Sequence, residues 1–406
     1  MNPAKKLYCR AFQIVFRAAL PILPYRNPTL LEGTDAIIPI LAENGVGRVM
    51  IVTDKGVHSL GLTNHLETAL ASAGIGYTLF DETVANPTTE NVEDARKRYL
   101  EEKCGAIIGF GGGSAMDCAK ALGARIARPK KPLAKMEGIL KVGKKIPLLI
   151  AVPTTAGTGS EATLAAVIVD SETRHKYPIN DFPLIPKYAV LDAEITRSLP
   201  PFVTATTGLD ALTHATEAYI GRSTTKETRE QSMEAVKLIF TYLERTYTDG
   251  NDMEARHEML KAAYLAGCAF TRSYVGYVHA VAHSLGGKYN VPHGLANAVL
   301  LPFVLEDYGE TAYKKLNQLA LAAGISEAGD SNEVGAKKFI FAVRELRQKL
   351  NIPDKIPEIR REDIPELARK ADAEGNPLYP VPMLLDAKEL ERYYFMVMEE
   401  KANDAC

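Results

Sequence analysis

A carboxylate and several imidazoles are spaced so that one metal ion could bind them together. Asp210 and His214 stand at i and i+4, as do His279 and His283. On a helix this spacing puts both side chains of a pair on one face. His293 follows at the start of a further expected helix. A carboxylate with imidazoles suits Fe²⁺ or Zn²⁺ better than Ca²⁺ or Mg²⁺, so the spacing predicts a transition-metal site. A histidine outside such a group is more simply a hydrogen-bonded or exposed side chain.

The number of candidate ligands bears on what such a site could do. Asp210, His214, His279 and His293 together would fill a tetrahedral zinc site and make it structural, because catalysis needs an open position. A catalytic site built from them requires five or more coordination positions, which iron accepts, or a ligand that can be displaced. No cysteine neighbours these residues in the sequence, which argues against a structural zinc site.

A glycine turn lies between an expected strand and an expected helix. The strand, Ala106 to Phe110, runs directly into GGGS, Gly111 to Ser114, and a helical pattern follows over 115–127. Glycines let the backbone approach a ligand, and free amides at a helix start attract anions, so the turn predicts a phosphate seat. It is neither the G-x-G-x-x-G fingerprint nor a P-loop. The alternative is that Ser114 caps the helix, with Asp117 three residues on.

Two other segments favour nucleotide binding. Asp54 directly follows the expected strand 48–53. An acidic residue at that place can bind a ribose hydroxyl and repel a 2′-phosphate, which favours NAD over NADP. The loop 153–163 follows another strand, and its hydroxyls could bond phosphate or ribose oxygens. They include Thr154, Thr155 and Thr158. Both features also have simpler explanations, since aspartates often serve in turns and loop hydroxyls often bond their own backbone.

The elements that must position these residues fall into two parts. From about residue 48 to 192, short β-branched runs alternate with amphipathic helical patterns, which predicts βαβ units and a parallel sheet. The runs are 48–53, 76–80, 106–110, 147–152, 165–170 and 188–192. After Pro200 and Pro201 the patterns are long and helical. We therefore predict an α/β dinucleotide-binding domain over residues 1–200 and an all-helical metal-binding domain over 201–406.

The composition excludes several other classes of protein. The 406 residues are 46% hydrophobic and 24% charged, which is typical of soluble globular chains and excludes disorder. A net charge of -2 predicts neither a nucleic-acid nor a membrane partner from the whole-chain field, although it leaves a local basic patch open. Five scattered cysteines without a C-x-x-C pair favour the cytoplasm. The amino-terminal cations could imitate a signal peptide, but Arg17, Pro21 and Pro24 interrupt the apolar core that such a peptide needs.

Four sequence blocks resemble the iron-containing, group III alcohol dehydrogenase family. They are GGGSAMDCAK (111–120), PTTAGTGSE (153–161), TGLDALTHATEAYI (207–220) and HAVAHSLGGKYNVPHGLANAVLLP (279–302). The blocks follow in the family's order, and the similarity extends from about Thr29 to the carboxyl terminus. The resemblance implies an amino-terminal nucleotide domain, a carboxyl-terminal helical metal domain and an active site in the cleft between them.

The resemblance also implies roles for single residues. Asp210, His214, His279 and His293 match the family's metal-ligand positions, and His283 matches a histidine near substrate and nicotinamide, which we take as catalytic. Asp54 matches a position where an acid accompanies NAD and a glycine NADP. The other implied cofactor contacts are Gly112, Gly113, Ser114, Asp117, Thr154, Thr155 and Thr158, with Lys176 and Leu199 matched more loosely.

The activity implied is hydride transfer between NAD(H) and a small primary alcohol or aldehyde, with Fe²⁺ or Zn²⁺ polarising the substrate oxygen. His283 could pass the released proton to solvent. The alternatives are a zinc-dependent polyol dehydrogenase of the glycerol type, a dehydroquinate-synthase-like lyase and a non-catalytic metal-binding module. The lyase needs several cations for an anionic substrate, whereas the stretch 270–283 offers only Arg272. The resemblance further implies a homodimer or an assembly of dimers.

Overall fold

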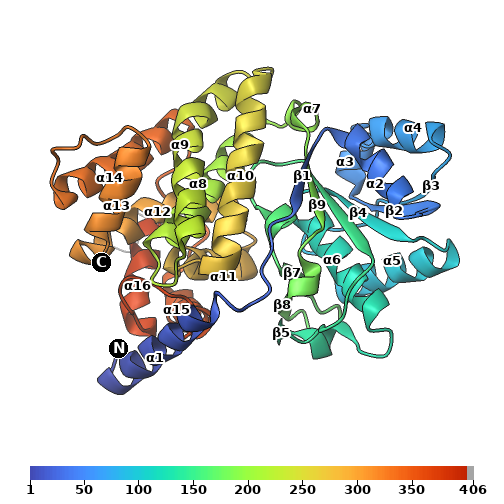
Figure 1. Ribbon diagram of the computed structural model, residues 1–406. Coiled ribbons are helices and arrows are strands. Elements are labelled where there is room, and N and C mark those ends of the chain that lie inside the picture. The colour runs from blue at the N-terminus through green and yellow to red at the C-terminus, as the bar shows by residue number, and fades with distance from the viewer. Residues whose placement is uncertain (400–406) are drawn as a thin grey trace. The chain divides into compact units, whose positions relative to one another are not determined.

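The computed structural model describes residues 1–399, which form two compact units (Figure 1). One unit is Pro24–Leu199, and the other joins Met1–Leu23 to the chain from Pro200 onward. The predicted division into 1–200 and 201–406 therefore differs at the amino terminus. Helix α1 (Pro3–Ala19) belongs with the helical unit because side chains on one of its faces bond backbone carbonyls there, among them that of Tyr379.

A six-stranded parallel sheet forms the centre of the α/β unit, in the order β1-β9-β6-β4-β2-β3. The strands are β1 (Thr29–Glu32), β2 (Arg48–Val52), β3 (Gly76–Phe80), β4 (Ala106–Gly111), β6 (Leu148–Pro153) and β9 (Tyr188–Leu191). The chain runs outward from β2 to β3 and then returns to the other side of β2 with β4, so the strand order reverses between β2 and β4. Open α/β sheets bind ligands beyond the carboxyl ends of their strands at such a reversal.

Both faces of this sheet are buried, as β2 illustrates. Met50 and Val52 belong to one hydrophobic cluster and Val49 and Ile51 to another, because successive side chains of a strand point to opposite faces. Residues of α5 (Thr89–Glu101) and α6 (Gly113–Ala127) join the first cluster, and residues of α2 (Ile37–Glu43) and α4 (Asn64–Ser72) join the second. Two short helices, α3 (Lys55–Ser59) and α7 (Ala193–Thr196), follow β2 and β9. The predicted α/β architecture is confirmed.

A smaller sheet in the same unit differs from the prediction. Its strands are β5 (Gly138–Ile139), β7 (Ala165–Val169) and β8 (Lys176–Asn180), in the order β5-β8-β7. The run 165–170, predicted as part of the parallel sheet, instead pairs antiparallel with β8. Strand β8 was not predicted because it contains Pro178, which cannot donate to a ladder. Proline is tolerated there because β5 pairs only with Ile179 and Asn180.

The second unit is helical, and an isolated bridge between Ile356 and Met398 is the only β pairing among its described residues. Its helices besides α1 are α8 (Pro201–Ile220), α9 (Lys226–Thr248), α10 (Met253–Ser273), α11 (Tyr277–Tyr289), α12 (His293–Tyr308), α13 (Glu310–Ala322), α14 (Asn332–Lys349), α15 (Ile364–Gly375) and α16 (Ala387–Val397). Over the part of the chain that is described, no helix combines the length and apolarity needed to cross a bilayer.

Helix α8 lies at the centre of this unit and is buried throughout 208–220. Its acidic and basic side chains, Asp210, His214 and Glu217, are buried as well. They stand at i, i+4 and i+7 and therefore share one face of the helix. Buried ionisable groups need partners, so this face defines where the chemistry of the helical unit must lie.

Candidate metal centre and nucleotide site

Asp210, His214, His279 and His293 converge in the helical unit. Each offers one ligand atom, and these atoms all lie within 4.8 Å of one another. Asp210 Oδ1 is 3.8 Å from His279 Nε2 and 3.4 Å from His293 Nε2. Asp210, His214 and His279 are buried, whereas His293 is half-buried. The structure thus brings together the four side chains that the sequence singled out as metal ligands.

Helices α8, α11 and α12 supply these side chains. A glycine allows α12 to pack closely against α8. A Cβ atom added at Gly294 would lie 2.4 Å from the carbonyl oxygen of Thr206 in α8, which no real Cβ contact allows. Only glycine therefore permits the first turn of α12 to approach α8 this closely. The approach places His293, the first residue of α12, beside Asp210.

Glu217, which the sequence analysis did not single out, holds His279 in position. Its Oε2 lies 2.6 Å from His279 Nδ1 and accepts a hydrogen bond from the Gly276 N–H at 2.8 Å. Its Oε1 accepts from the Val278 N–H at 2.8 Å. Burial raises the pKa of Glu217, whereas the hydrogen bonds from these backbone N–H groups lower it because they stabilise the ionised form. The carboxylate therefore ties the start of α11 to α8 and fixes the orientation of the imidazole.

His279 has the properties of a metal ligand. Burial, followed by the neighbouring imidazoles of His214, His293 and His283, holds its pKa well below the usual value, so the ring is neutral. With Nδ1 directed at Glu217, Nε2 points toward Asp210, and no hydrogen-bond partner for this buried nitrogen exists among the described residues. A buried polar atom without a partner is costly, and a divalent cation would satisfy it.

Asn297 is a second residue that the sequence analysis missed. It is fully buried one turn after His293 in α12. Its Nδ2 donates to Asp210 Oδ1 at 2.7 Å and lies 3.1 Å from His293 Nε2. Asn297 therefore fixes the relative positions of a carboxylate and an imidazole. One carboxylate, three imidazoles and these supporting contacts fit a divalent transition metal such as Fe²⁺.

His283 lies beside this cluster but belongs to a different hydrogen-bond network. Its ring stacks on that of His293 at a centroid distance of 5.0 Å, and its side chain is partly exposed. His283 Nδ1 lies 2.6 Å from Glu374 Oε1 of α15, which also accepts a hydrogen bond from the Tyr379 hydroxyl. Burial alone would raise the pKa of Glu374, but the charge and hydrogen bond of His283 lower it. The carboxylate thus orients a solvent-accessible imidazole at the edge of the cluster.

The glycine turn of the α/β unit follows β4, at the reversal of strand order. Gly111 ends β4 with φ of 156°, and a Cβ added there would lie 2.6 Å from that of Ala115. Helix α6 begins at Gly113, and its N-cap, Gly112, provides no side-chain hydrogen bond. Ser114 lies inside the helix and its Oγ accepts from the Asn86 N–H instead, so the capping alternative is wrong. The first amides of α6 are therefore not satisfied by a side-chain cap, as an anion site requires.

Asp54 lies next to this turn. It caps α3, where its Oδ1 accepts from the Val57 N–H at 3.0 Å. Its Oδ2 would lie 3.7 Å from a Cβ at Gly111. Because β2 and β4 are neighbouring parallel strands, the residues after them share one edge of the sheet. The structure thus brings Asp54 and the glycine turn together within the α/β unit.

The hydroxyl-rich loop lies at the same edge, because β6 pairs with β4 and aligns Pro153 with Gly111. The Thr154 N–H donates to the Gly111 carbonyl at 3.1 Å. Cβ atoms added at Gly112 and Gly113 would meet Thr155 at 3.9 Å and Thr158 at 3.4 Å. Three predicted threonines therefore surround the glycine turn.

Lys120, whose role was not predicted from the sequence, anchors this loop. Its buried ammonium group donates to Ser160 Oγ at 3.0 Å, to Thr163 Oγ1 at 2.8 Å and to the Ala165 carbonyl at 2.9 Å. Burial lowers its pKa to about 8. Asp117 lies one turn earlier in α6, where its carboxylate accepts from Ser160 Oγ and the Val167 N–H. Asp117 thus supports the loop through protein contacts.

The two loosely matched positions lie apart from these contacts. Lys176 is exposed in β8, and its ammonium group donates to Asn86 Oδ1 at 2.7 Å. Asn86 also contacts Ser114, so Lys176 is linked to the turn through one residue. Leu199 ends the α/β unit after α7, and its N–H donates to the Thr196 carbonyl. No hydrogen bond found within residues 1–399 links Leu199 to the glycine turn.

Comparison with known proteins agrees with this combination of a glycine turn on a parallel sheet and a histidine cluster among helices. Residues 30–193 match the family model described as iron-containing alcohol dehydrogenase, and residues 204–392 match that of the C-terminal region of the same family. The chain belongs to the iron-containing alcohol dehydrogenase family. The predicted resemblance is confirmed, and α1 lies before both matched regions.

Individual relatives agree with this assignment. The NAD-dependent methanol dehydrogenase of Bacillus methanolicus is 34% identical over 333 residues, which cover 82% of this chain and 87% of that protein. The 1,3-propanediol dehydrogenase of Klebsiella pneumoniae is 36% identical over 336 residues, with the same coverage of 82% and 87%. The crystal structure of a 1,3-propanediol oxidoreductase superposes with a TM-score of 0.88 at 33% identity, covering 91% of this chain and 98% of that one.

Proposed function

We propose that this protein is a metal-dependent oxidoreductase that transfers hydride between NAD(H) and a small primary alcohol or aldehyde. The observation that carries the proposal is the convergence of Asp210, His214, His279 and His293 within 4.8 Å. We propose these four as the ligands of Fe²⁺. The bound ion would supply Lewis-acid polarisation of the substrate oxygen, and NAD would supply the hydride acceptor.

The protein's own residues keep the ligands in the required protonation state. Three neutral imidazoles and one carboxylate would hold a divalent ion with a net charge of about +1. Glu217 helps to keep His279 neutral in the required tautomer. It accepts a hydrogen bond from the proton on Nδ1 and so leaves Nε2 as the ligand atom.

His283 is the group that we propose to move the proton. Its Nδ1 is held by Glu374, which leaves Nε2 as the atom that exchanges a proton. Its partial exposure offers a route to solvent. Oxidation of an alcohol releases one proton besides the hydride, and a neutral imidazole is suited to accept it.

The α/β unit supports the cofactor assignment. The uncapped start of α6 suits a pyrophosphate, for which we propose Gly112, Gly113 and Ser114, with Thr154, Thr155 and Thr158 beside them. Asp54 would bind the adenosine ribose of NAD and repel the 2′-phosphate of NADP. Asp117, Lys176 and Leu199 remain proposed cofactor contacts on the resemblance alone.

The relatives bear on the choice of metal, on the class of enzyme and on the substrate. The family match supports iron over zinc, and with it an alcohol dehydrogenase over the polyol dehydrogenase, the lyase and the non-catalytic module. The named activities of the relatives, on methanol and 1,3-propanediol, support a small alcohol as substrate. We further propose a homodimer, or an assembly of dimers, in the cytoplasm. Cys9, Cys104, Cys118 and Cys268 form no disulfides, which supports a reducing compartment, and Cys406 lies outside the described residues.

The test is metal analysis of anaerobically purified protein, coupled to an assay of NADH and NADPH oxidation with a panel of small aldehydes. We expect about one iron per chain and activity that depends on NADH. Protein that reduces the aldehydes equally well after complete removal of metal would overturn the proposal. A strong preference for NADPH would overturn the role given to Asp54.

A further inference from the structure

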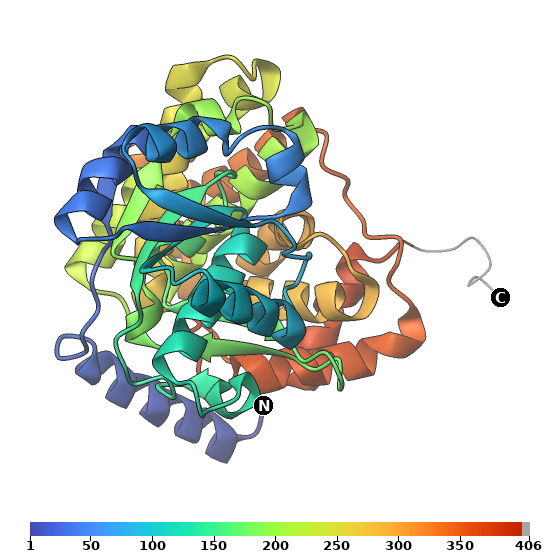
Figure 2. The same cartoon turned by 90° about the vertical axis from the view of Figure 1, so that its right-hand side faces the viewer.

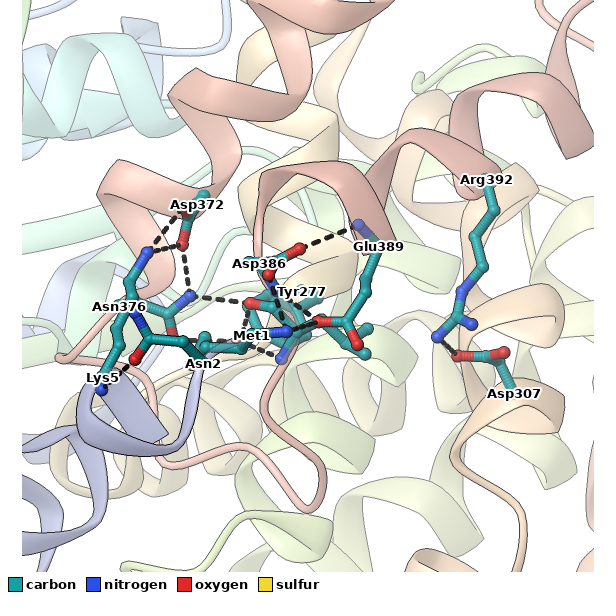
Figure 3. A network of polar contacts seen from close by, with 11 residues as sticks. Met1, Asn2, Lys5, Tyr277, Asp307, Asp372, Asn376, Asp386, Glu389 and Arg392 are labelled. Atoms are coloured by element: carbon teal, nitrogen blue, oxygen red, sulfur yellow. Dashed lines mark hydrogen bonds and ion pairs between the residues drawn. The ribbon is translucent and has the colours of Figure 1, made fainter. Parts of the chain in front are cut away.

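Helix α1 is attached to the helical unit through polar contacts. Buried Gln13 donates through Nε2 to the carbonyl oxygens of Tyr379 at 2.7 Å and Pro377 at 3.2 Å. Arg10 donates to carbonyl oxygens of the same segment, and Lys5 bonds both carboxylate oxygens of Asp372 at 2.8 and 2.7 Å. Figure 2 shows α1, in blue, beside the red carboxyl-terminal helices, and Figure 3 shows the contacts of its first residues with α15 and α16.

The opposite face of α1 is apolar and exposed. Leu7, Ile14 and Val15 are 73%, 67% and 70% exposed. Exposed alanines fill the spaces between them, and two aromatic rings continue the face. Its members are Ala4, Leu7, Tyr8, Ala11, Phe12, Ile14, Val15 and Ala18. An amphipathic helix normally turns its apolar face to the protein core, so α1 has the reverse orientation. A contiguous exposed apolar face of this kind marks a binding surface.

The charge around this face indicates what binds it. Residues 1–31 contain neither Asp nor Glu, although the whole chain has a charge of -2. Of the cations in α1, Lys5 pairs with Asp372 and Arg10 bonds backbone carbonyls, so Lys6 and Arg17 supply the charge beside the apolar face. Lys6 and Arg17 are exposed along one border of the apolar face. A groove of about 370 Å³ adjoins this border, with Lys6, Leu7 and Arg10 on one side and apolar residues such as Met383 on the other. A helix with an apolar face bordered by cations suits an anionic lipid surface, where apolar burial and headgroup attraction add.

A second copy of the chain would complement this face less well. Symmetric dimers pair the same surface patch on both subunits. Pairing of α1 with itself would bring Lys6 and Arg17 of one subunit close to the same cations of the other, without an acidic residue in the segment to offset them. Like charges brought together destabilise such a contact, whereas an anionic bilayer attracts them.

We propose that α1 is a peripheral membrane anchor that inserts its apolar face into the surface of a bilayer containing anionic phospholipid. The segment precedes both regions matched by the family, so this activity is additional to the dehydrogenase fold. The charge of the whole chain and the absence of a spanning segment predicted no membrane partner. The local charge of α1 has the opposite sign, and binding parallel to the surface requires no spanning helix.

The absence of tryptophan from this sequence allows a direct test. Tyr8→Trp places a single indole on the apolar face, and Phe341→Trp in α14 is a matched control, since both residues are 60% exposed. The full chain is mixed with vesicles of equal parts phosphatidylglycerol and phosphatidylcholine, or of phosphatidylcholine alone. We expect Trp emission of the Tyr8→Trp variant to shift to shorter wavelength only with the anionic vesicles, and that of the control not to shift.

Two double variants separate the contributions of charge and apolar surface. Lys6→Gln with Arg17→Gln should lower affinity for the anionic vesicles about thirtyfold, at roughly fivefold per cation near the surface. Lys130→Gln with Lys337→Gln makes the same change in net charge at exposed positions elsewhere and should leave vesicle binding intact. Ile14→Asn with Val15→Asn should abolish binding, and dehydrogenase activity in solution verifies that each variant is folded.

Two results would overturn the proposal. One is a Tyr8→Trp emission that anionic vesicles leave unchanged. The other is an emission already at short wavelength in buffer, accompanied by a sedimentation coefficient that falls in the Ile14→Asn, Val15→Asn variant, because this would show that a second copy covers the face.

Discussion

Glu217 Oε2 lies 2.6 Å from His279 Nδ1, and both side chains are buried. The two residues come from α8 and α11, so this one contact joins the helix that carries Asp210 and His214 to the helix that carries His279. It also selects the tautomer of His279 and turns Nε2 toward Asp210. The orientation of His279 in this candidate metal centre therefore depends on a carboxylate that is not itself one of the four clustered residues.

Replacing Glu217 with glutamine should weaken metal binding while leaving the four ligands in place. The amide group can accept only through its oxygen, whereas the carboxylate accepts from His279 and from the N–H groups of Gly276 and Val278. We expect iron affinity to fall 10- to 100-fold, as roughly found when partners of ligating histidines are removed. Anaerobic competition with a chelator measures this directly.

The control for this variant is Glu230→Gln in α9, which removes an exposed carboxylate that pairs with Lys226. Its metal affinity should equal that of the wild type. Near-ultraviolet circular dichroism tests whether the Glu217→Gln protein keeps its packing. A folded variant with unchanged iron affinity would show that Glu217 does not position His279.

His283→Ala should slow turnover by about 100-fold with metal content unchanged, because an acid or base in the proton path contributes about that much. Glu374→Gln should have a smaller effect, since the imidazole remains but loses its carboxylate partner. Iron content by elemental analysis and kcat with NADH and an aldehyde are measured together. His65→Ala is the matched control, because it removes an exposed imidazole that also pairs with a carboxylate, that of Asp35. Full activity of His283→Ala would remove this residue from the mechanism.

Asp54→Asn should relax the preference for NADH over NADPH by about tenfold in kcat/KM, or ~1.4 kcal/mol. Asparagine can still cap α3 through its side-chain oxygen, so the hydrogen bond to the Val57 N–H is kept and only the charge is lost. The control is Asp252→Asn, which makes the same change at the N-cap of α10. Unaltered relative use of the two cofactors would refute the proposed ribose contact.

Local spacing was sufficient to predict that two residues of the candidate metal centre share one helix face. Asp210 and His214 lie in one helix, and their i, i+4 relation follows from the sequence alone. The same rule could have found Glu217, three residues after His214, and Asn297, four residues after His293. Neither was predicted, because glutamate and asparagine in helices usually face solvent, and only the burial of α8 and α12 shows otherwise.

Contacts between distant segments could not be predicted in this way. Glu374 reaches His283 from α15, 91 residues away, and nothing in its own neighbourhood indicates a partner. The polar attachment of α1 likewise depends on carbonyl groups of 377–382, which a sequence pattern does not report. The pairing of strand 165–169 could not be predicted either, since its composition indicated a strand but not the neighbour with which it pairs. Periodicity identifies elements and faces, whereas tertiary topology decides what those faces meet.

Glu161 makes the stability of the protein depend on pH in a predictable direction. It is 2% exposed, and burial raises its pKa from 4.5 to about 7, although the nearby Lys120 ammonium acts against this. The folded state therefore holds a proton that the unfolded state loses at lower pH. The stabilisation is fully present below about pH 4.5 and is lost as the pH rises through about 7, an effect of ~3 kcal/mol at most.

Glu161→Gln is neutral at every pH, so its unfolding midpoint in urea should fall less than that of the wild type between about pH 5 and pH 8. Titrating groups that do not interact with Glu161 cancel in this comparison, and Glu172→Gln, an exposed change in the same unit, should behave as the wild type does. Equal losses in the wild type and Glu161→Gln would mean that the Glu161 carboxyl is already ionised at pH 5 and that the Lys120 ammonium stabilises its charge more than burial opposes it.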